Sequence, residues 1–236
     1  MIVTRLQGGL GNQMFQYAAG RAAAARRGVE LYLDLSWYDR PTSGATRRPF
    51  ELDALRAVAR VAGAELSSTL ERVRSTGLGR LRRPDYAYLK QQSRAFDPRV
   101  LEPGWQHLYL DGYWQSERYF SDIRDRLLGE LGVALPIEGA NAEMLRRIEG
   151  CEAVCVHVRR GDFSGNQAHG TCSVDYYARA SAHVRDRVAA AVFFVFSDEP
   201  DWNMDQLEQG QAAINVAHNP PSQGAEDHRM MRSCRQ

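Results

Sequence analysis

The sequence predicts an α/β protein made of two doubly wound domains, residues 1–135 and 136–236, that face a cleft. Each half opens with a short aliphatic strand pattern that runs into a loop of glycines or charged residues and then into a helical pattern. Pro136 marks the boundary between the halves. The 236 residues, 44% of them hydrophobic and 25% charged, can fill one large core or two modest ones.

The first half begins with a strand, helix and strand in succession. Residues 2–6 are β-branched and aliphatic, residues 12–27 are alanine-rich with helical composition, and residues 30–35 (ELYLDL) read as a second strand. From about residue 40 to residue 90 the chain is rich in Arg, Ser and Gly. That composition predicts short helices and solvated loops, with RSTGLGRLRRPDY as the least structured part.

An aromatic-rich stretch closes the first half. Residues 108–113 (LYLDGY) predict a strand, and residues 117–131 predict a helix that ends near Gly132. Its aromatic residues are Tyr109, Tyr113, Trp114, Tyr119 and Phe120. Aromatic faces suit sugar rings, but a strand-helix junction of this kind is more often core, and core packing is the preferred interpretation.

The second half repeats the alternation of helix and strand. Helices are predicted around residues 141–149 and 175–188. Strands are predicted at residues 153–158 (AVCVHV) and 192–196 (VFFVF). Both strands are apolar enough to be buried on two faces, as in a parallel sheet.

A glycine-rich turn, LQGGLGNQ, separates the first strand from the first helix. Gly9 and Gly11 let backbone amides approach a ligand at a helix N-terminus, where an anion is favoured. A dinucleotide fingerprint would need a third glycine where Met14 stands, although Asp34 lies at the spacing of a ribose contact. The alternative is a tight turn with Asn12 as the helix N-cap.

The segment HVRRGD leaves the strand of residues 153–158 at its carboxyl end, where open α/β sheets bind ligands. Strand alternation places His157 and Arg159 on one face and Arg160 on the other. We expect Arg159 to bind an anion such as a diphosphate, and Arg160 to brace the loop. The alternative is a structural arginine–aspartate pair involving Asp162.

Carboxylates follow the strand of residues 192–196, at Asp198, Glu199 and Asp201. They could bind a divalent ion, hydrogen-bond a ribose or cap the next helix. Capping is preferred, because an arginine available for a diphosphate reduces the need for a metal.

Charge and cysteine usage exclude several classes of partner. The formal charge is +1, from 30 basic and 29 acidic residues, so no nucleic-acid partner is indicated. No signal-peptide pattern or transmembrane segment is visible, which predicts a cytoplasmic protein, free or peripheral at the inner face of the membrane. The cysteines, predicted to be reduced and mostly packed, with no metal site, are Cys151, Cys155, Cys172 and Cys234.

Five stretches together resemble the bacterial α-1,2-fucosyltransferases of glycosyltransferase family 11. In chain order they are GGLGNQMFQYAAGRA, LDGYWQSERYF, HVRRGDF, HGTCSVDYY and FFVFSDEPDW. The HxRRxD pattern is shared more widely with α-1,6- and protein O-fucosyltransferases. The resemblance implies a GT-B-like fold of two Rossmann-type domains, the first on the acceptor side and the second binding the donor.

The implied reaction moves L-fucose from GDP-β-L-fucose to the 2-hydroxyl of a galactoside with inversion, in surface polysaccharide biosynthesis. The implied partners are GDP-fucose and a galactose-containing glycan, and neither a metal nor another cofactor is expected. An alternative is an inactive or binding-only remnant of the family. A further alternative is an NAD-dependent oxidoreductase, based on the glycine turn and Asp34.

The resemblance also implies roles for single residues. Arg159 matches the arginine expected to hold the donor diphosphate and act in catalysis, His157 a histidine near the guanine, and Asp162 the acid that closes the motif. The other residues expected at the donor side are Gly9, Gly11, Asn12, Arg160, Asp198 and Asp227. His169 is the candidate general base, with shaping of the acceptor pocket as its alternative.

Family members continue past the segment that contains Asp227 with a serine-containing stretch near the donor phosphates. The sequence ends at Gln236. We therefore expect a C-terminally shortened second domain with an incomplete sheet and a partial donor site.

Overall fold

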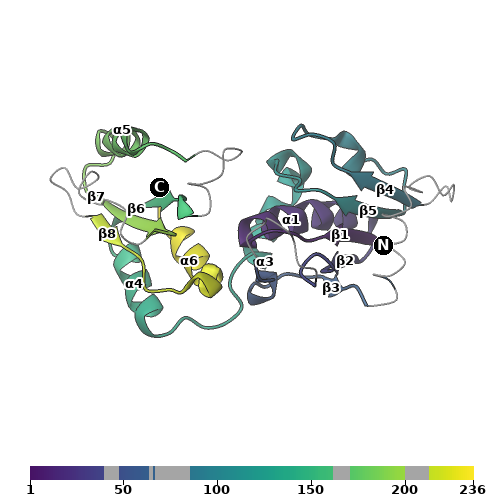
Figure 1. Ribbon diagram of the computed structural model, residues 1–236, viewed down its shortest axis with the longest axis horizontal. Coiled ribbons are helices and arrows are strands. Elements are labelled where there is room, and N and C mark those ends of the chain that lie inside the picture. The colour runs from purple at the N-terminus through teal and green to yellow at the C-terminus, as the bar shows by residue number, and fades with distance from the viewer. Residues whose placement is uncertain (40–47, 64–65, 67–85, 162–170, 200–212) are drawn as a thin grey trace. The chain divides into compact units, whose positions relative to one another are not determined.

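A computed structural model describes residues 1–39, 48–63, 66, 86–161, 171–199 and 213–236 (Figure 1). The chain divides into two compact units, Met1–Ala134 (unit 1) and Leu135–Gln236 (unit 2). Each unit is an α/β structure with a parallel sheet. The predicted fold class, two Rossmann-type units of the kind that build a GT-B fold, is confirmed.

Unit 1 contains a five-stranded parallel sheet with the strand order β3-β2-β1-β5-β4. Its strands are β1 (Ile2–Arg5), β2 (Leu31–Asp34), β3 (Arg60–Val61), β4 (Tyr86–Lys90) and β5 (His107–Asp111). Its α-helices in the described ranges include α1 (Leu10–Arg27) and α3 (Arg124–Glu130). Strand β1 has β2 on one side and β5 on the other, so the strand order reverses beside β1.

Helix α1 begins after the glycine turn and ends at a glycine. Its N-cap is Gly9, with no side-chain cap, so the predicted N-cap role of Asn12 is wrong. The amide oxygen of Asn12 instead accepts a hydrogen bond from Gln115 Nε2 at 2.8 Å. Gly28 closes the helix in the left-handed conformation (φ 63°), which glycine adopts without a Cβ clash.

The stretch predicted as one helix, residues 117–131, forms three shorter elements. Two 3₁₀ turns, Glu117–Tyr119 and Ser121–Ile123, precede α3. The buried ring of Tyr119 accounts for the interruption, because its hydroxyl accepts a hydrogen bond from the amide of Asp97 at 2.7 Å. Burying this ring takes precedence over continuing a regular helix.

Two strands of unit 1 lie where short helices and loops were expected. They are β3, which has only two residues, and β4, which pairs along its whole length with β5. The part of RSTGLGRLRRPDY that precedes Tyr86 lies outside the described residues.

Unit 2 contains a three-stranded parallel sheet with the order β6-β7-β8. Its strands are β6 (Glu152–Val158), β7 (Ala191–Ser197) and β8 (Ala213–Asn215). Its described helices are α4 (Gly139–Glu149), α5 (Val174–Arg185) and α6 (Gly224–Met231). Strand β8 was not predicted, whereas α4, α5, β6 and β7 lie close to their predicted ranges.

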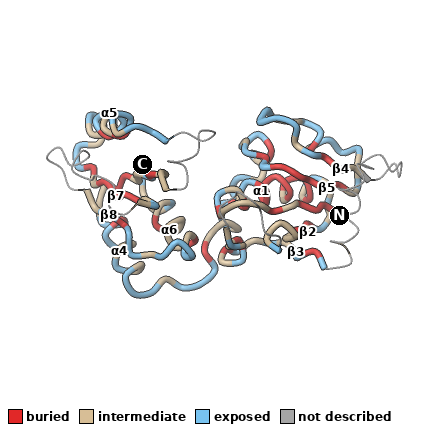
Figure 2. Tube along the Cα trace, in the orientation of Figure 1, coloured by how far each residue is buried: buried red, intermediate tan, exposed pale blue. Residues whose placement is uncertain are grey.

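Strand β7 is buried on both faces, as its apolar run predicts (Figure 2). Phe194 and Phe196 join a core with Ile148 of α4 and Met230 of α6. Val195, which lies between them in the sequence, faces the opposite side of the sheet and packs with Val158 of β6 and Tyr177 of α5. Helices therefore cover both faces of this sheet, which is the doubly wound arrangement.

The four cysteines are free thiols. Cys151, Cys155 and Cys234 pack against the core that contains Phe194, whereas Cys172 is exposed. Within the described ranges, none of the helices is both long enough and apolar enough to cross a membrane.

The core of unit 2 depends on Phe194, whose side chain is fully buried. We expect Phe194→Ala to lower the free energy of unfolding of unit 2 by about 3–5 kcal/mol, because the variant loses transfer free energy and leaves a cavity. Urea unfolding followed by hydrogen–deuterium exchange of unit 2 peptides measures this. Leu135→Ala, at a position 70% exposed, is the control and should change stability by no more than about 0.5 kcal/mol. A loss below about 1 kcal/mol in the Phe194 variant would contradict the assigned core.

Candidate functional site

The carboxyl ends of β6 and β7 lie side by side in unit 2, because the strands are parallel neighbours and Val158 pairs in register with Ser197. The HVRRGD segment and the acidic SDEP segment start from these two ends. Arginines and carboxylates that are about 40 positions apart in the sequence therefore meet at one edge of the sheet.

Asp198 makes the central contacts of this edge. Its Oδ2 pairs with Arg159 Nη1 at 3.1 Å. Its Oδ1 accepts hydrogen bonds from the backbone amides of Arg160, at 2.8 Å, and Gly161, at 3.2 Å. One carboxylate thus fixes both the guanidinium of Arg159 and the backbone that follows it. This role of Asp198 was not predicted from the sequence.

The two arginines of the motif contact different acids. Arg160 Nε donates to Glu199 Oε2 at 3.1 Å, and the amide of Glu199 donates to Ser197 Oγ at 3.0 Å. Arg160 thus braces the loop, as predicted. The arginine–aspartate pair at this loop uses Asp198. Asp162, the acid considered for such a pair, lies outside the described residues.

His157 occupies the face of β6 that helix α6 covers. Strand alternation puts it on the side of Ala153, which belongs to the same core as Met230 of α6. His157 itself is exposed, but desolvation by the surrounding protein lowers its pKa below the ordinary value, and the Arg159 guanidinium lowers it further. Asp198 and Asp227 raise it by smaller amounts. The imidazole is therefore biased toward its neutral form.

Asp227 lies on α6 within electrostatic reach of His157. Its Oδ1 accepts a hydrogen bond from Asn219 Nδ2 at 2.8 Å, and the same amide group donates to Asn141 Oδ1 at 3.0 Å. Burial raises the pKa of the Asp227 carboxyl, although the Asn219 hydrogen bond and nearby His218 oppose the shift. The structure therefore brings His157, Arg159, Asp198 and Asp227 into one cluster.

Of the predicted residues of unit 1, Gly9 is the N-cap of α1, and Gly11 and Asn12 lie in the first turn of the helix. In the turn between β1 and α1, Gly8 has a positive φ of 79°. The side chain of Gln13 stabilises the turn, because its Nε2 donates hydrogen bonds to Gly8 O at 3.0 Å and to Pro49 O at 2.9 Å. The N-terminus of helix α1 lies at this turn, but the turn is stabilised chiefly by neutral amide groups.

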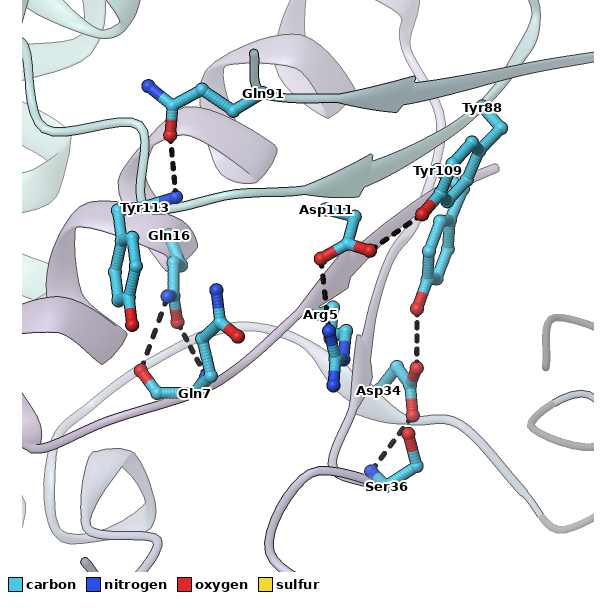
Figure 3. Close-up of polar contacts among 10 residues, drawn as sticks. All are labelled: Arg5, Gln7, Gln16, Asp34, Ser36, Tyr88, Gln91, Tyr109, Asp111 and Tyr113. Atoms are coloured by element: carbon cyan, nitrogen blue, oxygen red, sulfur yellow. Dashed lines mark hydrogen bonds and ion pairs between the residues drawn. The ribbon is translucent and has the colours of Figure 1, made fainter. Parts of the chain in front are cut away.

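The carboxylate expected to contact a ribose, Asp34, is engaged within unit 1 (Figure 3). Its Oδ2 accepts from the Tyr109 hydroxyl at 2.6 Å, and its Oδ1 accepts from the Ser36 amide at 2.9 Å. The residue is 3% exposed. A buried carboxylate with both oxygens occupied is a poor ribose ligand, which argues against the dinucleotide interpretation.

A largely buried ion pair lies beside Asp34, and it was not predicted from the sequence. Arg5 Nη1 pairs with Asp111 Oδ1 at 3.1 Å, while Tyr88 donates to Asp111 Oδ2 at 2.6 Å (Figure 3). The rings of Tyr88 and Tyr109 stack at 5.3 Å. The only sequence signal was a charged residue at the last position of each of two apolar strands.

The aromatic residues near β5 divide into core and surface. Tyr109, Trp114 and Tyr119 are buried, as preferred from the sequence. Phe120 is half-buried. Tyr113 is 44% exposed.

Three residues of the sequence-predicted set cannot be placed, because Asp162, His169 and Asp201 lie outside the described residues. Over the ranges that the structure does describe, no group of three or more His, Cys, Asp or Glu side chains is arranged to hold a metal ion.

Comparison with known proteins places this chain in a family. The sequence model of glycosyl transferase family 11 matches residues 81–236, about two thirds of the chain. The chain therefore belongs to glycosyl transferase family 11, as its motifs predicted.

Two curated relatives come from Escherichia coli. An alpha-1,2-colitosyltransferase is 29% identical over 208 residues, covering 86% of this chain and 70% of the relative. The O-antigen biosynthesis glycosyltransferase WbnK is 24% identical over 260 residues, covering 98% of this chain and 83% of the relative. Among solved structures, the NodZ alpha-1,6-fucosyltransferase soaked with GDP-fucose has a TM-score of 0.44 and 14% identity. That match covers 98% of this chain and 81% of NodZ, which is known from Bradyrhizobium.

Removing the positive charge or the negative charge near His157 should shift its pKa in opposite directions. Arg159→Gln should raise the pKa of His157, because it removes a nearby positive charge, and Asp198→Asn should lower it further. Two-dimensional NMR titration of the imidazole C–H signals measures both. Arg187→Gln, just beyond the C-terminal end of α5 and not among the charges that act on His157, should leave the pKa of His157 unchanged. Shifts of the same sign in the Arg159 and Asp198 variants would contradict the cluster.

Proposed function

We propose that this chain transfers L-fucose from GDP-β-L-fucose to the 2-hydroxyl of a galactoside, forming an α-1,2 linkage with inversion during surface polysaccharide biosynthesis. The observation that carries the proposal is Arg159, a partly exposed guanidinium at the carboxyl end of β6 that Asp198 fixes in place. The family assignment and the α-1,2-transferring relative support it.

The donor diphosphate binds at Arg159 in this proposal. A guanidinium presents several N–H donors in one plane and can form two charge-assisted hydrogen bonds with phosphate oxygens. Because Asp198 orients Arg159 and also holds the amides of Arg160 and Gly161, the positive group is positioned before the donor arrives. Asp198 thus supports the donor site without contacting the donor.

The guanine base binds near His157 and Asp227. A carboxylate can accept two parallel N–H bonds from the Watson–Crick edge of guanine, and Asp227 is the acid that the cluster offers on α6. Its raised pKa shows that its charge is poorly solvated in the free protein. Hydrogen bonds from guanine would offset the free-energy cost of holding this poorly solvated charge. A neutral His157 beside it can donate or accept a hydrogen bond.

The reaction is a direct displacement at the anomeric carbon of fucose. The acceptor hydroxyl oxygen forms a bond to that carbon while the bond to the β-phosphate oxygen breaks, and GDP leaves with the electron pair. The transition state has oxocarbenium character, by analogy with glycoside hydrolysis. Arg159 stabilises the negative charge that accumulates on the departing diphosphate, so no metal ion or other cofactor is required in this proposal.

The acceptor hydroxyl must lose its proton to a base during this step. We assign that role to His169, which follows the HVRRGD segment in the sequence. Asp162 closes the same segment and is assigned to the donor side.

A second donor deserves the same test, because one relative is an alpha-1,2-colitosyltransferase. Colitose is the 3-deoxy counterpart of L-fucose, so both sugars fit the mechanism described above. A site that hydrogen-bonds the 3-hydroxyl would reject colitose strongly, whereas an apolar site would discriminate weakly.

The product decides between these functions. The purified chain is incubated with GDP-fucose or GDP-colitose and with lactose, in the presence of EDTA, and the product is characterised by mass spectrometry and NMR. We expect a fucosylated trisaccharide in which the new bond is α and joins the 2-hydroxyl of galactose. A colitosylated product alone would assign the second donor. No glycosyl product from a folded chain on a wider panel of β-galactosides would contradict the proposed activity.

Donor binding depends on Arg159 in this proposal. We expect Arg159→Ala to weaken GDP-fucose binding by about tenfold to a hundredfold, because charge-assisted hydrogen bonds contribute about 1.5–3 kcal/mol. Isothermal titration calorimetry with EDTA present measures the affinity. Arg187→Ala, an exposed arginine of the same unit, is the matched control and should bind as the unmodified chain does. Equal affinity in both variants would remove Arg159 from the donor site.

A further inference from the structure

The loop after β5 presents one aromatic ring to solvent at the carboxyl edge of the unit 1 sheet. Tyr113 is 44% exposed, whereas Trp114, the next residue, is fully buried. A large aromatic ring left exposed costs solvation free energy, so a folded protein gains from covering it with a ligand. The ring is therefore a candidate for recognition.

The backbone that carries Tyr113 is fixed by contacts from β4 and from the core. Gln91, which follows β4, accepts hydrogen bonds through its Oε1 from the amides of Tyr113, at 2.8 Å, and Trp114, at 3.2 Å. Gly112 makes this contact possible, since a Cβ at that position would lie 2.4 Å from the Cβ of Gln91.

Trp114 anchors the other side of the same loop. It adopts a positive φ of 53°, which is rare for a bulky residue, and its ring packs edge-on against Tyr119 at 5.7 Å. This turn of the backbone sends the Trp114 ring into the core and leaves the Tyr113 ring outside. A ring held in this way is pre-organised, so a ligand that covers it need not order the loop.

The position of the ring fits a binding site. Strand β5 lies next to β1, where the strand order of the sheet reverses, and ligands of open α/β sheets bind at the carboxyl ends of such strands. Figure 3 shows Tyr113 pointing from its loop toward Gln7, whose backbone N–H and C=O exchange two hydrogen bonds with the side chain of Gln16. The loop after β5 contacts the first turn of α1 directly, since Gln115 Nε2 donates to Asn12 Oδ1 at 2.8 Å.

The polar groups near the ring include phenols and amides. Tyr38 lies close enough to Tyr113 for the two phenols to interact electrostatically, and its hydroxyl donates to Gly8 O at 3.0 Å. Asn12 and Gln115 contribute carboxamides at the same edge. Carboxamide and hydroxyl groups exchange hydrogen bonds with sugar hydroxyls, and an aromatic face packs against the C–H groups of a pyranose ring.

We propose that Tyr113 is the platform on which a pyranose ring of the acceptor glycan stacks, with Asn12, Gln115 and Tyr38 as its hydrogen-bonding neighbours. The identification of this sugar with the acceptor rests on the proposed function. The subsite itself rests on the exposed ring, its fixed loop and the polar groups around it. It makes Tyr113 a residue that determines acceptor affinity, separate from the donor residues of unit 2.

The test is saturation-transfer-difference NMR of the full chain with lactose, methyl β-galactoside and methyl α-mannoside as probes, without donor. We expect transfer to at least one galactoside, and a loss of about fivefold to tenfold in affinity for Tyr113→Ala. Tyr113→Phe and Tyr113→Trp keep an aromatic face and should retain binding. Tyr176→Ala removes an aromatic that is 50% exposed in unit 2 and should bind sugar as the unmodified chain does.

The outcomes separate this inference from the proposed function. Galactoside binding that survives Tyr113→Ala, or no binding of any probe by the folded chain, overturns the subsite, even if GDP-fucose still binds through Arg159. Sugar binding that requires the Tyr113 ring supports the subsite. If GDP-fucose then fails to bind, the subsite stands and the proposed donor is wrong. Calorimetric titration of GDP-fucose into the same samples supplies the second reading.

Discussion

The contacts of the Asp198 carboxylate determine the geometry of the candidate donor site. They join the end of β7 to the Arg159 guanidinium and to two amides of the β6 loop. Without this acid, the loop would have to satisfy those donors with water, and Arg159 would lose the partner that orients it. A carboxylate beside a diphosphate would otherwise repel it, so Asp198 is compatible with the donor only because the arginine and the amides neutralise it. Direct donor binding by Asp198 would require these contacts to break.

The two units place their candidate functional side chains at the same position in the fold, but these side chains differ in chemistry. In each unit the functional side chains lie at the carboxyl ends of parallel strands. In unit 1 the charges at these ends are paired internally, since Arg5 contacts Asp111 and Asp34 contacts Tyr109. What remains accessible there includes a phenol ring and carboxamides. In unit 2 the ion pair at the strand ends, Arg159 with Asp198, is more exposed, since its side chains are 32% and 24% accessible, against 15% and 7% for Arg5 and Asp111. A charged nucleotide therefore suits unit 2, and a neutral sugar suits unit 1.

The elements that local sequence patterns define were predictable, and those defined by distant contacts were not. The apolar runs of β6 and β7 are long enough to identify themselves, and each leads directly into its charged loop. Strand β8 has three residues, and β4 follows an arginine-rich stretch, so neither has a clear periodic signal. The predicted N-cap failed because α1 begins at Leu10, two residues earlier than expected, which puts Asn12 inside the first turn and makes Gly9 the N-cap.

In the candidate site, too, the sequence indicates which residues take part, whereas contacts between distant segments decide how they are arranged. The sequence indicates that the HVRRGD segment holds the anion-binding arginine, but strand pairing decides which acid orients it. For the aromatic stretch, the sequence is even less informative about the structure. Tyr113 and Trp114 are adjacent and chemically alike, yet one is exposed and the other is fully buried. The difference comes from a single backbone angle at Trp114 and from the side chain of Gln91, more than twenty positions earlier. Composition favours an aromatic core at this junction, and only the three-dimensional contacts show which ring is left available to a ligand.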